Sequence, residues 1–262
     1  MSMKEHILSQ ITTECPWRDT LYWFDTIDST NTRAKVMARE GAPQGTVLVA
    51  GHQSAGRGRL GRSFSSPVGM GVYLSVILRP NCPPDKLMHL TCAAGLAGRN
   101  AVERVSGALP EIKWPNDLIL GEKKLGGILT ELGFRGNVVD YAIVGIGINC
   151  CQRKEDFPKE LQTIATSLAE QTGKAFSPAR LAALLTEELC KMDTLLFDHK
   201  AELLAQYRLA CSTFGKEITV IQGEQKRYAT ALDIDPDGGL VVKFSDGTKK
   251  IVNSGEVSVR YL

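Results

Sequence analysis

The feature that most constrains the fold is a long polar segment between two apolar ones. Residues 46–50 and 72–78 are mostly apolar, as in strands that are buried on both faces. The residues between them, 51–71, are rich in Gly, Ser and Arg and are too many for an ordinary turn. A loop of this length is usually functional or disordered. The sequence therefore predicts a buried sheet with a long, unusual loop between two of its strands.

Further segments predict an α/β fold. The capping residues at 28–31 indicate a helix that ends before Gly41. Residues 85–105 predict a helix whose small side chains favour close packing. Residues 121–124 are typical of a hairpin turn. Short strands are expected at residues 112–114, 118–120, 125–132 and 138–148.

The composition changes after Asn149 and again near residue 212. Residues 157–209 carry apolar side chains at helical spacing and are expected to be mostly helical. After Gly215, about five short strands with tight turns at 235–238 and 245–247 predict a small β-barrel. We therefore expect two domains, residues 1–211 and 212–262.

Charge and composition exclude several classes of protein. With 31 Lys and Arg against 29 Asp and Glu, the net charge of +2 gives no reason to expect a dedicated nucleic-acid binder. The first residues lack the apolar run of a signal peptide, and no run approaches the roughly 18 apolar residues of a membrane helix. The 7 cysteines form no Cys-x-x-Cys pair and suggest reduced thiols in a cytoplasmic protein. The 4 histidines are far apart, which argues against a zinc site.

The loop contains three arginines among glycines. Gly56, Gly58 and Gly61 satisfy the Gly-x-Gly-x-x-Gly pattern, but a strand and not a helix follows, so a dinucleotide site is not expected. The P-loop pattern fails as well, because Lys-Ser/Thr is missing. What remains is a flexible backbone carrying guanidinium groups, which bind carboxylate and phosphate. We expect the loop to be loose when empty and ordered by an anionic ligand. A solvated loop with incidental arginines is the alternative.

Three other segments place cations and amides at strand ends. Lys113-Trp-Pro-Asn-Asp117 contains a proline that kinks the strand beside an amide and a carboxylate. Lys124 precedes two glycines that permit close approach of a ligand, and Asn149 ends an apolar strand. Each alone is typical of solvated turns. Together they indicate a site for a phosphate or an anhydride.

At this point the chain resembles the biotin protein ligases, from about residue 20 to 262. Five motifs carry the resemblance in order: Asp28-Ser-Thr-Asn31, Gln53 with Gly56-Arg-Gly-Arg-Leu-Gly-Arg62, Lys113-Trp-Pro-Asn-Asp117, Lys124-Leu-Gly-Gly-Ile128 and Gly145-Ile-Gly-Ile-Asn149. The tail, residues 254–258, resembles the C-terminal domain of the family. Two positions depart from it, since Phe64 stands where relatives often have Trp and Gly126 where they often have Ala.

The resemblance implies a fold and a reaction. The fold is a mixed-sheet α/β domain, shared with lipoate ligases, followed by an SH3-like barrel. The reaction is a carbon–nitrogen ligation in two steps. Biotin and ATP, with Mg²⁺, give biotinyl-5′-AMP, and a lysine of the biotin carboxyl carrier protein of acetyl-CoA carboxylase then attacks it.

The resemblance also implies roles for individual residues, with Lys124 as the first choice for bridging the carboxylate and the α-phosphate. The catalytic residues are Lys124, Arg57 and Arg59. The biotin-binding residues are Ser29, Thr30, Asn31, Gln53, Gly56, Arg57, Gly58, Arg59, Lys124 and Gly127. The nucleotide-binding residues are Arg59, Arg62, Phe64, Lys113, Asn116, Asp117 and Asn149. No dedicated metal site is expected, because Mg²⁺ arrives with ATP, with Asp117 nearby.

Family members that also repress transcription carry an N-terminal helix-turn-helix domain. Because the first motif begins at Asp28, we expect no operator binding, and no membrane partner either. The oligomeric state stays open, since relatives are monomers or homodimers. Two other functions compete with biotin ligation: lipoate or octanoate transfer, and nucleic-acid binding through the arginine loop and the barrel.

Overall fold

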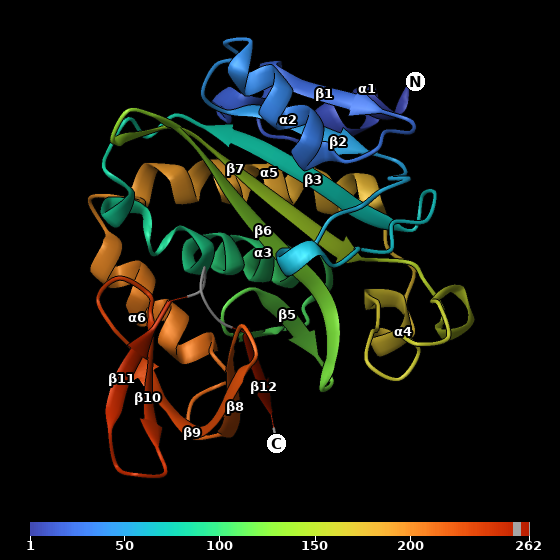
Figure 1. The fold of residues 1–262 in the computed structure, drawn as a ribbon. Coiled ribbons are helices and arrows are strands. Elements are labelled where there is room, and N and C mark those ends of the chain that lie inside the picture. The colour runs from blue at the N-terminus through green and yellow to red at the C-terminus, as the bar shows by residue number, and fades with distance from the viewer. Residues whose placement is uncertain (254–257, 262) are drawn as a thin grey trace.

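A computed structural model describes residues 1–253 and 258–261, which form two sheets (Figure 1). The larger sheet has seven strands in the order β1-β2-β3-β7-β6-β5-β4. Its β1–β2 pair is parallel and its other pairs are antiparallel, so the expected mixed sheet is confirmed. The strands are β1 (Leu21–Phe24), β2 (Thr46–Ala50), β3 (Gly71–Leu78), β4 (Glu111–Lys113), β5 (Asp117–Leu120), β6 (Lys123–Arg135) and β7 (Val138–Asn149).

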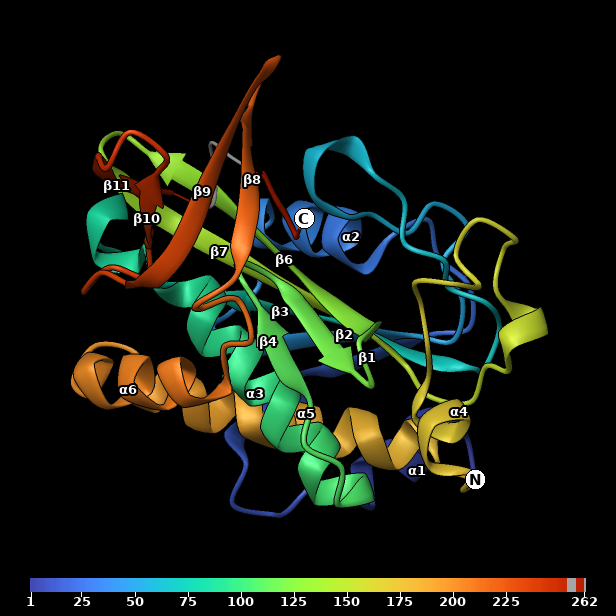
Figure 2. The same ribbon diagram turned by 90° about the horizontal axis from the view of Figure 1, so that it is seen from below.

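Helices cover both faces of this sheet (Figure 2). On one face, α3 (Leu90–Ser106) and α5 (Pro178–Leu195) pack with Val47, Val49 and Val76 in the main core. On the other face, Ala34 and Ala38 of α2 (Thr30–Arg39) join a smaller core with Leu48, Ile77 and Ile143. Successive strand residues point to opposite faces, so the continuous apolar strands expected from the sequence fill both cores. Helices α1 (Met3–Leu8), α4 (Leu168–Thr172) and α6 (Lys200–Ala210) complete the layer on the α3 side.

The second sheet is antiparallel, with the strand order β11-β10-β9-β8-β12. Its five strands match the expected number, and turns join β9 to β10 and β10 to β11 as predicted. The strands are β8 (Glu217–Gln222), β9 (Gln225–Ile234), β10 (Leu240–Phe244), β11 (Lys249–Val252) and β12 (Ser258–Tyr261). Residues 254–257 of the tail motif lie outside the described residues.

Two predictions of helical structure are wrong in their extent. The helix expected from residue 85 begins at Leu90, after a 3₁₀ turn at Pro84–Leu87. The segment expected to be mostly helical, residues 157–209, has its helices from Leu168 onward; residues 157–167 form turns, and two of their backbone groups make tertiary hydrogen bonds. Lys124 N donates to Ile164 O at 2.8 Å, and Thr166 N donates to Lys124 O at 2.9 Å. This segment therefore runs beside the start of β6. Helix α1 and strand β1 were not predicted from the sequence.

Candidate active site

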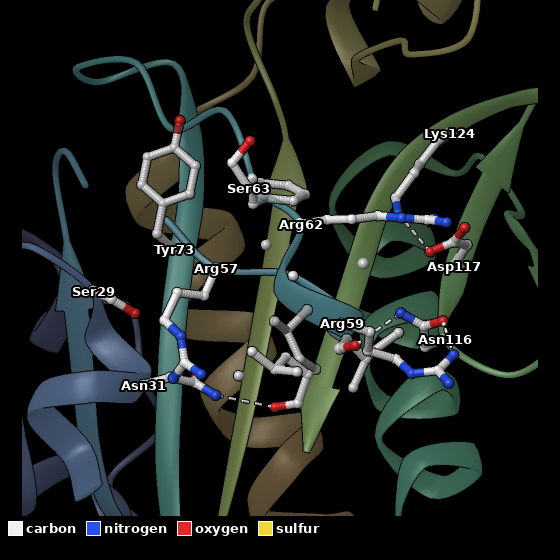
Figure 3. Close-up of a pocket in the computed structure, with 18 of the residues that line it drawn as sticks. Ser29, Asn31, Arg57, Arg59, Arg62, Ser63, Tyr73, Asn116, Asp117 and Lys124 are labelled. Atoms are coloured by element: carbon white, nitrogen blue, oxygen red, sulfur yellow. Dashed lines mark hydrogen bonds and ion pairs between the residues drawn. The ribbon is translucent and has the colours of Figure 1, made fainter. Parts of the chain in front are cut away.

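A cleft opens on the α2 side of the large sheet, between the loop after β2 and strands β5 to β7 (Figure 3). It encloses about 950 Å³, including space that is continuous with solvent. All five sequence motifs contribute to it. The predicted residues that line it are Ser29, Thr30, Asn31, Gln53, Arg57, Gly58, Arg59, Arg62, Phe64, Lys113, Asn116, Asp117, Lys124 and Gly127.

One end of the cleft is a network of uncharged polar groups. Thr30 N and Thr30 Oγ1 both donate to Gln53 Oε1, at 2.8 and 3.1 Å. Ser75 Oγ lies 2.8 Å from Thr30 Oγ1 and donates to Asn31 Oδ1 at 2.6 Å. Thr30 and Asn31 begin α2, and Ser29 is its N-cap. The helix start thus presents a fixed array of donors and acceptors to a ligand.

Two glycines of β7 make room for side chains of the cleft. A Cβ at Gly145 would lie 1.9 Å from Asn31 Oδ1, and one at Gly147 would lie 2.6 Å from the ring of Phe64. The Phe64 ring meets Tyr73 edge-on, with centroids 6.4 Å apart. The Gly-Ile-Gly sequence is therefore required by the bulk of facing side chains.

Arg57 turns toward the uncharged end of the cleft. Its Nη1 and Nη2 lie 2.9 and 3.0 Å from the two carboxylate oxygens of Glu131 in β6. Glu131 also accepts hydrogen bonds from Lys35 Nζ at 2.8 Å and Asn31 Nδ2 at 3.0 Å. A two-point ion pair of this kind fixes the guanidinium in direction as well as in position. It ties the loop to β6.

The opposite end of the cleft carries cationic side chains of the loop and of β6, together with the amide of Asn116 and the carboxylate of Asp117. Arg59 Nη1 donates to Asn116 Oδ1 at 3.0 Å, and Lys124 Nζ donates to Asp117 Oδ1 at 2.6 Å. Figure 3 shows Arg62 on the same side as Lys124, away from Ser29 and Asn31. Arg57 and Arg59, which the resemblance placed together among the catalytic and biotin-binding residues, therefore point to different ends.

Burial and neighbouring charges act on two of these groups. Burial lowers the pKa of the Arg59 guanidinium, against the attraction of Asp117, and Arg62 lowers it further. Burial raises the pKa of the Glu131 carboxyl, but hydrogen bonds from Lys35, Asn31 and Arg57 outweigh burial and hold that pKa below its ordinary value. Glu131 is consequently ionised at neutral pH.

Two predicted site residues do not line the cleft. Asn149 is buried, donates from Nδ2 to Thr166 O at 2.9 Å, and accepts from Gln152 Nε2 at 3.2 Å. It joins the end of β7 to the segment beside Lys124. A Cβ at Gly56 would lie 2.4 Å from Phe64 O, so this glycine allows the two sides of the loop to approach.

Sequence reasoning missed several contributors. Ser75 is the one polar residue in the apolar run 72–78, and this break in the pattern was a usable signal. Glu131 gave no such signal, because it stands in a strand of mixed exposure and forms its ion pairs only in the folded chain. Tyr73 also lines the cleft, and the glycines of β7, which the sequence showed only as part of a motif, shape it.

The arginine loop is held in a narrow hairpin. Gly58 N donates to Arg62 O at 2.7 Å, and Phe64 N donates to Gly56 O at 2.9 Å. Leu60 at the tip has a φ of 56°, in the left-handed region, and its side chain is exposed. The loop thus projects one apolar side chain into solvent while its arginines face the cleft.

Within residues 1–253 and 258–261, no three His, Cys, Asp or Glu side chains are grouped as metal ligands. The carboxylate at the cationic end is that of Asp117, which is paired with Lys124. The helices of the same described residues include none long and apolar enough to span a bilayer.

Comparison with known proteins places this cleft in a family. Residues 23–149 match the Biotin/lipoate A/B protein ligase family, and residues 213–260 match the Biotin protein ligase C terminal domain. The bifunctional ligase/repressor BirA of Bacillus subtilis is 38% identical over 238 residues, which are 89% of this chain and 72% of that protein. The biotin–[acetyl-CoA-carboxylase] ligase of Mycobacterium tuberculosis is 33% identical over 87% of this chain and 85% of its own.

A solved structure agrees with these matches. The biotin protein ligase of Aquifex aeolicus, in complex with biotin and ATP, superposes with a TM-score of 0.79 and 32% identity over 92% of this chain and 99% of that one. The chain belongs to the biotin protein ligase family. The family and the class of enzyme expected from the sequence are thereby confirmed.

Proposed function

We propose that this chain joins biotin to ATP as biotinyl-5′-AMP, and then transfers the biotinyl group to a lysine of the biotin carboxyl carrier protein of acetyl-CoA carboxylase. The observation that carries the proposal is the polarity of the cleft, with uncharged Thr30 and Gln53 at one end and Lys124 and Arg59 at the other. A ligand with a neutral ureido head and a carboxylate tail fits this polarity. The names of the Mycobacterium and Aquifex relatives agree with these substrates.

In the first step, a biotin carboxylate oxygen attacks the α-phosphorus of ATP and the bond to pyrophosphate breaks. Two anions must meet, so a cation is required between them. Lys124 is suited to this task. Its backbone N–H and C=O are both hydrogen-bonded, which fixes the main chain, and Gly127 has no side chain that would crowd the amine. Its ammonium group would bridge the carboxylate and α-phosphate oxygens as charge moves during the attack.

In the second step, the carrier lysine attacks the acyl carbon and AMP leaves. Arg59 and Phe64 would cover the mixed anhydride and keep water away until the carrier arrives. Nucleotide contacts are proposed for residues at the cationic end: Arg62, Lys113, Asn116 and Asp117. Asn149 would act indirectly, by holding in place the segment that runs beside Lys124. Mg²⁺ would accompany ATP, bound mainly by phosphate oxygens, as this ion prefers.

Further expectations belong to the same proposal. The two units are residues 1–211 and 212–262, and the enzyme works in the cytoplasm. The expectation that the chain does not bind operator DNA stays a prediction, which a sequence-specific mobility shift at physiological salt would overturn. Sedimentation of the protein with and without biotin and ATP tests for a homodimer.

The decisive experiment is ATP–pyrophosphate exchange by the purified protein. Exchange that depends on biotin, and that neither lipoate nor octanoate supports, is expected. Exchange supported by lipoate would favour the other branch of the matched family. If neither biotin nor lipoate supports exchange, and the protein binds nucleic acid in a salt-sensitive way, nucleic-acid binding would be favoured instead.

A further inference from the structure

Glu131 is a partly buried carboxylate whose partners all belong to or border the uncharged end of the cleft. Its side chain is 19% exposed, and it contacts Arg57 and Lys35 as ion pairs. It also accepts from Asn31, yet it does not itself line the cleft. We infer that Glu131 is a positioning residue for biotin: it sets the orientation of the Asn31 amide and tethers the arginine loop through Arg57. This inference rests on the proposed function.

The amide orientation follows from counting donors and acceptors. Asn31 Nδ2 donates to Leu129 O at 3.2 Å and to Glu131 Oε2 at 3.0 Å, and neither atom can donate in return. If the amide were flipped, Asn31 Oδ1 would face these two acceptor oxygens with no hydrogen between them. Asn31 Oδ1 is consequently held toward Ser75, 2.6 Å away, and against Gly145. One lone pair of Oδ1 remains to accept an N–H from a ligand, which is the hydrogen-bonding group of a ureido ring.

The tether follows from the charges. Glu131 faces two cations, Arg57 from the loop and Lys35 from α2. With the carboxylate present, the two cations are held in place. Without it they repel each other, and the loop loses its link to β6. Removing one partner of a charged, partly buried hydrogen-bond network leaves the others unsatisfied, which costs more than an exposed pair.

Glu131→Gln is the informative variant, because it keeps the size of the side chain and removes the charge. Its amide nitrogen must also face a donor, either Arg57, Lys35 or Asn31, so the network cannot be completed. Glu111→Gln is the matched control, since Glu111 is an exposed strand residue in β4. The biotin KM and the ATP KM are measured for each protein by pyrophosphate exchange, and trypsin cleavage after Arg57, Arg59 and Arg62 is followed by mass spectrometry.

We expect Glu131→Gln to raise the biotin KM by about tenfold or more, the effect of one lost charge-assisted hydrogen bond, and to change the ATP KM much less. Trypsin should cut its loop faster than that of the wild type, whereas Glu111→Gln should match the wild type in both measurements. Glu131→Asp retains the charge with a shorter reach, so it should recover part of the biotin affinity. It is also the variant of choice if Glu131→Gln does not fold.

The outcomes distinguish failure of the proposed function from failure of this inference alone. Absence of biotin-dependent exchange in the wild type would overturn the proposed function and this inference with it. Exchange by the wild type, with an unchanged biotin KM in the folded Glu131 variants, would overturn the inference alone. Equal rises in the biotin and ATP KM values would overturn the role given to the Asn31 amide, because loss of the loop tether alone acts through the hairpin on both ends of the cleft.

Discussion

The indole Nε1 of Trp114 donates a hydrogen bond to the backbone oxygen of Gly238, 3.0 Å away. Trp114 lines the cleft and is almost fully buried, while Gly238 lies in the turn between β9 and β10 of the second sheet. The same turn is closed by Asp235 Oδ1, which accepts from Gly239 N at 2.8 Å. A turn of the second sheet thus supports the segment that carries Asn116 and Asp117.

Trp114→Phe should therefore weaken both the fold and the nucleotide end. Leaving the Gly238 carbonyl without its donor costs about 1–3 kcal/mol, measurable by urea unfolding, and the ATP KM should rise more than the biotin KM. Trp23→Phe is the control, because Trp23 donates to Asp25 at the exposed surface. A larger loss of stability from Trp23→Phe would contradict the role given to the Trp114 bond.

Lys124→Ala should abolish adenylate formation while the protein stays folded. The side chain is 38% exposed, and within residues 1–253 and 258–261 its ion pair is with Asp117, so its removal costs little stability. Lys123→Ala is a close control: Lys123 precedes it in β6 but pairs with Glu170 outside the cleft. Exchange rates and circular dichroism of both variants test this, and an unfolded Lys124→Ala would instead assign the lysine a structural role.

Arg59→Ala should weaken retention of the adenylate. Without this guanidinium beside Asn116, biotinyl-5′-AMP escapes faster and biotinylates bystander lysines, which blotting with labelled streptavidin detects. Arg135→Ala serves as the control, since Arg135 is an exposed residue paired with Asp140. Release of the adenylate at the wild-type rate would show that Arg59 does not close the cleft.

Gly145→Ala should act on the biotin end only. The new Cβ would overlap Asn31 Oδ1, which must move, so the biotin KM rises while the ATP KM changes little. Gly95→Ala, in α3, introduces a Cβ at an ordinary 3.5 Å from Ile112 and should leave both constants unchanged. An unaltered biotin KM for Gly145→Ala would mean that the Asn31 amide is not part of the biotin site.

The stability contributed by Glu131 should depend on pH. Its pKa is lowered in the folded protein, so the contribution is complete above the ordinary glutamate pKa of about 4.3 and is lost as pH falls through the lowered value. The difference in Tm between wild type and Glu131→Gln should be largest near neutral pH and shrink as pH drops below about 4. A difference that stays constant with pH would indicate that the loss comes from packing.

Local patterns in the sequence were sufficient for the central strands and for most of the cleft. The runs 46–50 and 72–78 are apolar throughout most of their length, so β2 and β3 appear within one residue of the expected bounds. The capping residues before Thr30 likewise located the start of α2. Where backbone groups find distant partners, local patterns fail, as in the turns at 157–167 that hydrogen-bond with Lys124.

The residues of the site likewise divide into those that local patterns predicted and those that they did not. Residue types and motif order identified Lys124, Asn31 and Asp117 as cleft residues, because each belongs to a compact motif. The direction of a long side chain is not encoded locally, so the divergence of Arg57 and Arg59 could not be foreseen. Glu131 was missed for the same reason, since its partners come from two other segments of the chain, α2 and the arginine loop.

Arg57 and Arg59 are two residues apart on one narrow hairpin, yet they hold Glu131 at one end of the cleft and Asn116 at the other. A ligand that displaces the hairpin at either end therefore shifts the guanidinium at the far end as well. By thermodynamic reciprocity, whatever change biotin makes to the affinity for ATP, ATP must make to the affinity for biotin. If binding at one end moves the hairpin, the hairpin links the two binding equilibria without any contact between the two substrates.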